Sequence, residues 1–287
     1  MIAATEAQEA DWLEAARRAT DALREILNDA PTTAERVRET GTRGEGGDST
    51  LLIDAAAEEA VFAELDRLHA EGHRFRAVSE ERGTVDYGGA AGFPIVVIDP
   101  IDGSLNAKRR IPSHSISIAV ADGPTMADVF FGYVYDFGPD EEWVAYRGAG
   151  ALLDGVALPT APGERRTLDG RLEVLGIESA DPRWMAQAAT ALVETTHRVR
   201  AMGTIAVTLC QVAAARFDAM ATLKGCRAVD AAAGQLIVRE AGGHVAFTRY
   251  RDPLAAPLDL VPYSALVAAR TEEGLADAAR VPQMPRA

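Results

Sequence analysis

The sequence of 287 residues predicts an α+β N-terminal half, residues 1–158, and an α/β C-terminal half, residues 167–287. In the first half, two segments with helical periodicity are followed by consecutive strand-like segments, whereas strands and helices alternate in the second half. The change of pattern falls at the proline-containing stretch 159–166. This length suits one large domain or two tightly joined halves, and we expect one compact unit.

Two amphipathic helices are expected first, because apolar residues recur at helical spacing near the N-terminus. The recurring residues are Trp12, Ala15, Ala16, Ala19, Leu23, Ile26 and Leu27 in the first helix, and Ile53, Ala57, Val61, Leu65 and Leu68 in the second. Pro31 lies beyond the end of the first helix, and the second helix is expected to run to about Glu71. The glycine-rich residues 41–50 predict a mobile loop or a tight turn.

Strands are predicted next, because short runs of β-branched and apolar residues lie between turn signals. In the N-terminal half they are residues 74–78, 95–98, 115–121, 128–135 and 142–146. Gly148, Gly150 and Gly155 are expected to end this strand-rich region. The C-terminal half is predicted to contain strands at residues 172–177, 197–201 and 218–223, and helices at residues 183–195, 205–216 and 230–241.

The charge balance excludes some partners. Asp and Glu number 43 against 29 Lys and Arg, so the net charge is −14. Such a surface repels phosphate backbones, which disfavours nucleic-acid binding. No apolar run approaches the roughly 18 residues that span a membrane. The acidic N-terminus MIAATEAQEADW lacks a signal pattern, so we expect a cytoplasmic protein without a membrane partner.

Lysine is nearly absent and occurs only at Lys108 and Lys224. One explanation is a halophilic protein, because dense carboxylates keep a surface hydrated in a salt-rich cytoplasm. The other is a GC-rich genome that replaces lysine by arginine, which accounts for the arginines but not for the acids. The two cysteines, Cys210 and Cys226, form neither a disulfide framework nor a zinc-binding spacing.

The stretch IVVIDPIDGSLN, residues 95–106, predicts a buried strand that ends in two acids, Asp99 and Asp102. An unpaired acid in an apolar surrounding costs several kcal/mol, and two acids three residues apart repel each other. A metal ion between them removes both penalties. Gly103 and Ser104 follow directly, and backbone N–H groups at the start of a helix suit a phosphate.

Further acids lie at element boundaries elsewhere in the chain: Glu80 and Glu81 in SEERG, Asp54 in the second helix, and Asp230 at the start of a later helix. Taken alone, each of these acids is interpreted as a helix cap or a solvent-exposed acid. Together they suggest a carboxylate cluster around hard cations, and magnesium favours sites that it shares with phosphate oxygens.

Other catalytic patterns are missing from the sequence. It contains no GxSxG elbow, no GxxxxGK[ST] loop and no HExxH motif. His114 in IPSHSIS is close to the acids in sequence, but we interpret it as a packed or surface histidine.

Several segments resemble the inositol monophosphatase family of magnesium-dependent, lithium-sensitive phosphatases. DPIDGSLN is similar to the first family signature, and VDAAAGQLIVREAGG (229–243) is similar to the second. SEE (79–81), DSTLLID (48–54) and MGTIAV (202–207) resemble shorter family segments, in family order. The resemblance implies a layered α/β/α/β/α sandwich, usually a homodimer, with two or three Mg²⁺ per active site and Mn²⁺ as an alternative.

The resemblance also implies roles for individual residues. The metal ligands would be Glu80, Asp99, the Ile101 carbonyl, Asp102 and Asp230, and the catalytic groups Glu80, Ser104 and Asp54. Ser104 stands in place of the usual threonine and would orient the attacking water, while Glu80 or Asp54 draws off its proton. Substrate contacts would come from Asp102, Gly103, Ser104, Gly203, Thr204 and Arg227.

Departures from the family pattern bear on the substrate. Val229 replaces a common tryptophan, giving RAVD, a form associated with archaeal enzymes that act on both inositol phosphate and fructose bisphosphate. Ala107 replaces an aromatic residue, and the basic run 108–110 follows. We therefore expect hydrolysis of the 1-phosphate of fructose 1,6-bisphosphate, a step of gluconeogenesis, with inositol monophosphates as slower substrates.

The alternatives are an inositol-1-monophosphatase, a 3′-phosphoadenosine 5′-phosphate phosphatase, or a non-enzymatic regulatory binder. An inactive descendant should have lost at least one metal acid, and all are present. Arg227 is expected to hold a second phosphate, and the alternative is that it pairs with the protein's own acids. For Arg109 and Arg110 neither of these two roles is favoured.

Overall fold

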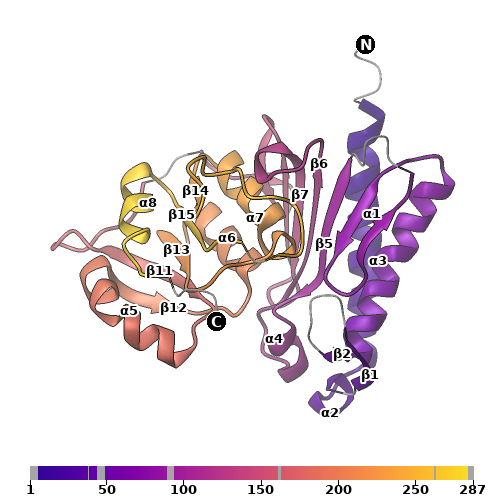
Figure 1. Ribbon diagram of the computed structural model, residues 1–287, viewed down its shortest axis with the longest axis horizontal. Helices are drawn as coiled ribbons and strands as arrows, with labels where there is room; N and C mark the ends of the chain where they lie inside the picture. Colours follow the sequence, from indigo (N-terminus) through magenta and orange to yellow (C-terminus); the bar gives the residue numbers. More distant parts are fainter. Residues whose placement is uncertain are drawn as a thin grey trace.

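Two main β-sheets alternate with three layers of helices in the computed structural model (Figure 1). The structure describes residues 6–37, 39–43, 49–88, 94–160, 163–261 and 263–283. The layers in order are α1 (Glu6–Asp29) with α3 (Leu52–Ala70), an eight-stranded sheet, α6 (Ile205–Ala213) with α7 (Ala228–Glu240), a five-stranded sheet, and α5 (Pro182–Thr195) with α8 (Glu272–Ala278). This arrangement confirms the expected sandwich.

The eight-stranded sheet belongs to the N-terminal half. Its strands are β3 (Arg76–Ser79), β4 (Gly83–Asp86), β5 (Ile95–Asp102), β6 (Ser115–Ala121), β7 (Val129–Asp136), β8 (Glu141–Tyr146), β9 (Gly150–Leu153) and β10 (Val156–Ala157), in the order β10-β9-β8-β7-β6-β5-β3-β4. Only the β3–β5 pair among these neighbours is parallel. The expectation that Gly148, Gly150 and Gly155 end the strand region was wrong, because the chain turns there and adds β9 and β10.

The five-stranded sheet belongs to the C-terminal half. Its strands are β11 (Leu172–Glu178), β12 (Thr196–Arg200), β13 (Ala219–Thr222), β14 (His244–Phe247) and β15 (Leu266–Ala269), in the order β12-β11-β13-β15-β14. Strand β11 pairs in parallel with both β12 and β13, so the C-terminal ends of these strands lie at the same edge. The alternation of strands and helices confirms the predicted α/β pattern. Strands β14 and β15 and helix α8 were not predicted from the sequence.

The segment between α1 and α3 differs from the prediction. The short helix α2 (Thr33–Arg36) is followed by β1 (Glu39–Arg43) and β2 (Ser49–Leu51), which pair in an antiparallel manner. The mobile loop or tight turn expected over residues 41–50 was therefore wrong at both ends of that range. Residues 44–48 of the same prediction lie outside the described residues.

Helix α7 is the centre of the core. Every residue from Ala228 to Val238 is buried, because α7 packs against β6 and β7 of one sheet, β14 of the other sheet, and α6. The small side chains of the run VDAAAG allow this close packing from several sides. The start of α7 is thereby fixed beside β5. Among the described residues, no helix is both long and apolar enough to cross a membrane.

Candidate active site

A bulge at the end of β5 turns two acids to one side of the sheet. Asp99 pairs with Ser117 and Asp102 pairs with Ser115, so three steps on β5 match two steps on β6. Residues two apart in a strand face the same side, and the partners of Ser115 and Ser117 therefore do so as well. The bulge explains how acids three residues apart can serve one site.

Three acids from three elements converge at this edge. Glu80 follows β3, Asp99 lies near the end of β5, and Asp230 is in the first turn of α7. One carboxylate oxygen from each lies within 4.8 Å of the others. Parallel pairing of β3 with β5 places their C-terminal ends side by side, which brings Glu80 next to Asp99.

The electrostatics of this cluster favour a bound cation. Burial raises the pKa of Asp99 well above its ordinary value, and the neighbouring charges of Glu80, Asp102 and Asp230 raise it further. Burial, followed by the charge of Asp230, raises the pKa of Asp102 to about 8. Burial also raises the pKa of Glu80. Crowded carboxylates of this kind fit a hard divalent ion such as magnesium, which relieves their mutual repulsion.

Arg227 supplies positive charge to the same acids. Its guanidinium donates to Glu80 at 2.7 Å and to Asp230 at 3.2 Å. Burial alone would lower the pKa of Arg227, but the charges of Asp230, Glu80 and Asp99 outweigh burial and raise it. The backbone N–H of Arg227 also donates to Asp230 at 2.9 Å, so Asp230 closes the first turn of α7 while it faces the cluster.

Asp102 is directed toward a different partner, the start of α6. Its carboxylate accepts hydrogen bonds from the Thr204 hydroxyl and from the backbone N–H of Ala206, the latter at 2.7 Å. Gly103 packs against Gly203: a Cβ on Gly103 would lie 3.1 Å from the Gly203 carbonyl oxygen. Both glycines have positive φ, which other residues rarely adopt. The turn after β5 and the turn before α6 therefore fit together at close range.

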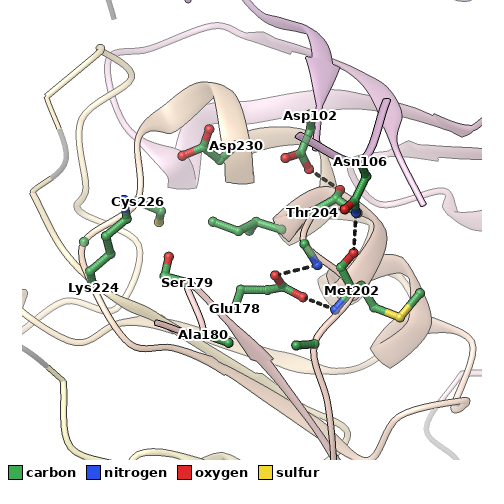
Figure 2. A pocket seen from close by; sticks show the side chains of 14 residues that line it. Asp102, Asn106, Glu178, Ser179, Ala180, Met202, Thr204, Lys224, Cys226 and Asp230 are labelled. Carbon is green, nitrogen blue, oxygen red and sulfur yellow. Dashed lines mark hydrogen bonds between the residues drawn. The ribbon is translucent and has the colours of Figure 1, made fainter. Parts of the chain in front are cut away.

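These turns border a cavity of about 380 Å³ (Figure 2). The residues that line it are Asp102, Asn106, Glu178, Ser179, Ala180, Ala201, Met202, Gly203, Thr204, Ile205, Lys224, Gly225, Cys226 and Asp230. Its volume lies in the range typical of small-ligand pockets. Figure 2 shows Asp102 and Asp230 on one wall, facing Glu178 and Ser179 on the other.

Two side chains that the sequence analysis did not single out hold the loop before α6. Glu178 accepts hydrogen bonds from the backbone N–H groups of Met202 and Gly203, and Asn106 donates to the Met202 carbonyl (Figure 2). Burial raises the pKa of Glu178 to about 7, although the bonds from Thr208, Met202 and Gly203 oppose that shift. Glu178 is the last residue of the apolar strand β11, as Asp102 is of β5, so the signal was present in the sequence.

The remaining predicted residues lie around the cluster rather than in it. Asp54, in the first turn of α3, is 3.6 Å from the ammonium of Lys108. Ser104 begins the short helix α4 (Ser104–Arg109), and Ile101 is buried within the bulge. Arg227 is not among the residues that line the cavity. His114 is buried and stacks on Phe137, which agrees with its interpretation as a packed histidine.

Comparison with known proteins identifies a family that matches nearly the whole chain and relatives that match most of it. The sequence model of the inositol monophosphatase family matches residues 8–283. The fructose-1,6-bisphosphatase/inositol-1-monophosphatase of Methanothermobacter thermautotrophicus is 34% identical over 211 residues, which cover 70% of this chain and 72% of that protein. The Nus factor SuhB of Pasteurella multocida is 34% identical over 202 residues, which cover 69% and 71%.

A solved structure shows the same fold. The protein PH1897 of Pyrococcus horikoshii, described as having similarities to inositol-1 monophosphatase, superimposes with a TM-score of 0.76. The match covers 95% of this chain and 98% of the other, at 22% sequence identity. At this identity the likeness concerns the fold alone.

Proposed function

The chain belongs to the inositol monophosphatase family and is a phosphoric monoester hydrolase, and we propose that it removes the 1-phosphate of fructose 1,6-bisphosphate in a magnesium-dependent reaction. Inositol monophosphates would be slower substrates. The observation that carries the proposal is the convergence of Glu80, Asp99 and Asp230 beside a cavity of small-molecule size. The similarity to the Methanothermobacter fructose-1,6-bisphosphatase/inositol-1-monophosphatase supports this choice of substrate.

The metal ligands in this proposal come from three segments: the turn after β3, strand β5 and the start of α7. Glu80, Asp99 and the Ile101 carbonyl would hold one Mg²⁺, and Asp99, Asp102 and Asp230 would hold a second. Mn²⁺ could take the same oxygen ligands. When bound, these ions would neutralise charge on the phosphate and make water a stronger nucleophile.

The chain's own groups would position the reactants. The Ser104 hydroxyl would orient the attacking water, and Glu80 or Asp54 would accept its proton. Backbone N–H groups of Gly103 and Ser104 would hold the phosphate, which the water attacks in line with the leaving oxygen. Gly203 and Thr204 line the cavity and would contact the sugar. A role for Arg227 in binding the substrate stays a prediction.

Two alternatives have specific support. An inositol-1-monophosphatase is favoured by the family match, and a regulatory binder by the likeness to Nus factor SuhB. Retention of all the predicted metal acids argues for catalysis over a purely regulatory role. A cytoplasmic homodimer, a halophilic source and a place in gluconeogenesis belong to the same proposal and rest on the composition and the resemblance.

The test is phosphate release from a panel of substrates in magnesium at several KCl concentrations. The panel comprises fructose 1,6-bisphosphate, inositol 1-phosphate and 3′-phosphoadenosine 5′-phosphate. We expect the highest kcat/KM for fructose 1,6-bisphosphate and no release after chelation with EDTA. A clear preference for either other substrate would replace the proposed one, and release that persists in EDTA would overturn the magnesium requirement.

A further inference from the structure

The cavity has one wall that the proposed chemistry does not use. That wall is built at the C-terminal ends of β11 and β13, which pair in parallel with Glu178 opposite Thr222. Ser179 follows β11 and Lys224 follows β13, and both line the cavity. Ligands of α/β sheets commonly bind at such strand ends. Ser179 and Lys224 therefore lie where the non-reacting part of a substrate would extend.

The loop that carries Lys224 is fixed by hydrogen bonds on both sides. The Leu223 N–H donates to the Glu178 carbonyl at 3.0 Å, and the Cys226 N–H donates to the Ser264 carbonyl at 2.9 Å. The Thr222 hydroxyl donates to the carbonyl of Lys224 itself at 2.9 Å. Because the loop is already fixed, little conformational entropy of its backbone is lost when Lys224 binds a ligand, which favours binding.

Lys224 is the one positively charged side chain among the described residues that line the cavity. It makes no ion pair within the part of the chain that the structure describes, although the chain is rich in acids. Its ammonium lies 6.0 Å from the centroid of the Trp184 ring. Arg227, in contrast, is already engaged by Glu80 and Asp230. The charge of Lys224 is thus available to a ligand.

The other acidic or basic side chains that line the cavity are Asp102, Glu178 and Asp230, and all three are acids. Lys224 is therefore the lining side chain that can offer a positive charge to a second anionic group on a substrate. Figure 2 shows Lys224 at the edge of the cavity, across from Asn106 and Met202, and the Ser179 hydroxyl directed into the interior. Ser179 has a positive φ of 57°, which is uncommon for a serine and frequent at functional positions.

We propose that Lys224, with the hydroxyl of Ser179, forms a subsite for a second phosphate on the substrate, distant from the metal acids. Lys224 is then the residue that selects a bisphosphate over a monophosphate. The proposal rests on the proposed function and deepens it, because it names the group that distinguishes fructose 1,6-bisphosphate from the monophosphates. A sugar or a nucleotide could carry the second phosphate.

The test compares two sugars that differ only in the distal phosphate, fructose 1,6-bisphosphate and fructose 1-phosphate. In Lys224→Gln, kcat/KM for the bisphosphate should fall about 10- to 100-fold, mainly through KM, because a hydrogen bond to a charged group is lost. The value for fructose 1-phosphate should change less than about twofold. Lys224→Arg should retain most of the selectivity. Arg198→Gln removes one exposed charge from β12, outside the cavity, and should leave both values unchanged.

Equal losses on both sugars, or no loss in Lys224→Gln, would overturn the subsite. If the wild type prefers 3′-phosphoadenosine 5′-phosphate and Lys224→Gln loses that preference, the subsite is supported and its substrate is a nucleotide. If the wild type hydrolyses none of these compounds, the proposed function fails separately. The subsite is then judged by calorimetric binding of fructose 6-phosphate in the presence of inorganic phosphate, which should weaken at least about tenfold in Lys224→Gln and is overturned by unchanged binding.

Discussion

At the scale of single residues, Arg227 shows how the candidate centre keeps its acids together. Its guanidinium bridges Glu80 and Asp230, and these two acids belong to different halves of the chain. Removing one partner of a buried charged network leaves the other charges uncompensated. The structure thus favours pairing with the protein's own acids over the phosphate-binding role expected from the sequence.

Arg227→Ala should therefore destabilise the protein most when magnesium is absent. We expect the free energy of unfolding to fall by about 1.5–3 kcal/mol, because hydrogen bonds to charged acceptors are lost. Added magnesium should restore part of the loss, since cations replace the missing positive charge. Urea unfolding with and without magnesium measures this, with Arg227→Lys as the variant that keeps the charge. An identical loss at every magnesium concentration, with selective loss of the bisphosphate reaction, would instead support a substrate-binding role.

At the scale of elements, the cavity depends on the loop between β12 and α6. Glu178, at the end of β11, holds this loop through two backbone N–H groups and also accepts from the Thr208 hydroxyl at 2.7 Å. Asn106 of α4 holds the same loop through the carbonyl of Met202 at 2.6 Å. The turn at Gly203 and Thr204 is therefore positioned from both halves of the chain.

The stability of the protein should depend on pH through Glu178. Its pKa is raised by burial to about 7, so between its unfolded pKa and that value the native state binds more protons than the unfolded state. Its contribution to stability is thus greatest in acid and is lost as the pH rises toward 7. Relative to the wild type, Glu178→Gln should gain about 3 kcal/mol in unfolding free energy between pH 4 and pH 8.

Urea unfolding of both proteins across this pH range provides the measurement. The difference between them is the informative quantity, because other acids titrate equally in both. Thr248→Val is a control that removes a hydroxyl far from Glu178 in the sequence and carries no titrating group. A difference that stays constant with pH would show that Glu178 titrates at its ordinary value.

The elements were predictable where local pattern and tertiary packing agree. The predictions of α1, α3 and the strand before Asp99 were correct. In each of these elements the apolar residues of the sequence pattern are the ones that pack into the core. The short strands β14 and β15 were missed, because the pairing of β15 with β14 and with β13 is non-local. The bulge that aligns Asp99 with Asp102 also depends on pairing with β6.

At the scale of the whole molecule, the candidate site lies between the two halves. Glu80, Asp99 and Asp102 come from residues 1–158, while Asp230 and the cavity wall with Lys224 come from residues 167–287. The acids could be predicted from their places at the ends of strands or, for Asp230, at the start of a helix. The ion pairs of Arg227 could not be predicted, and neither could the lack of an ion pair at Lys224 among the described residues. Both depend on which side chains meet across the two halves. The division into two halves itself stays a prediction.

The acidic surface of the whole molecule predicts a response to salt. With a net charge of −14, repulsion between carboxylates opposes folding, and at 1 M salt this repulsion is screened within ~3 Å. We expect the melting temperature to rise as KCl increases toward molar concentrations. Calorimetric melting in dilute buffer and in KCl measures the effect. Equal stability in both would remove the halophilic interpretation and leave the catalytic proposal untouched.

The central claim is that a divalent cation held by Glu80, Asp99 and Asp230 drives the hydrolysis. Asp99 is 3% exposed and is shared by both proposed metal positions, and an amide cannot supply its charge. Phosphate release from fructose 1,6-bisphosphate should therefore fall roughly 1000-fold in Asp99→Asn at saturating magnesium, equivalent to about 4 kcal/mol of transition-state stabilisation. Asp169→Asn, on an exposed turn, should behave as the wild type. Near-normal turnover by Asp99→Asn would contradict the account.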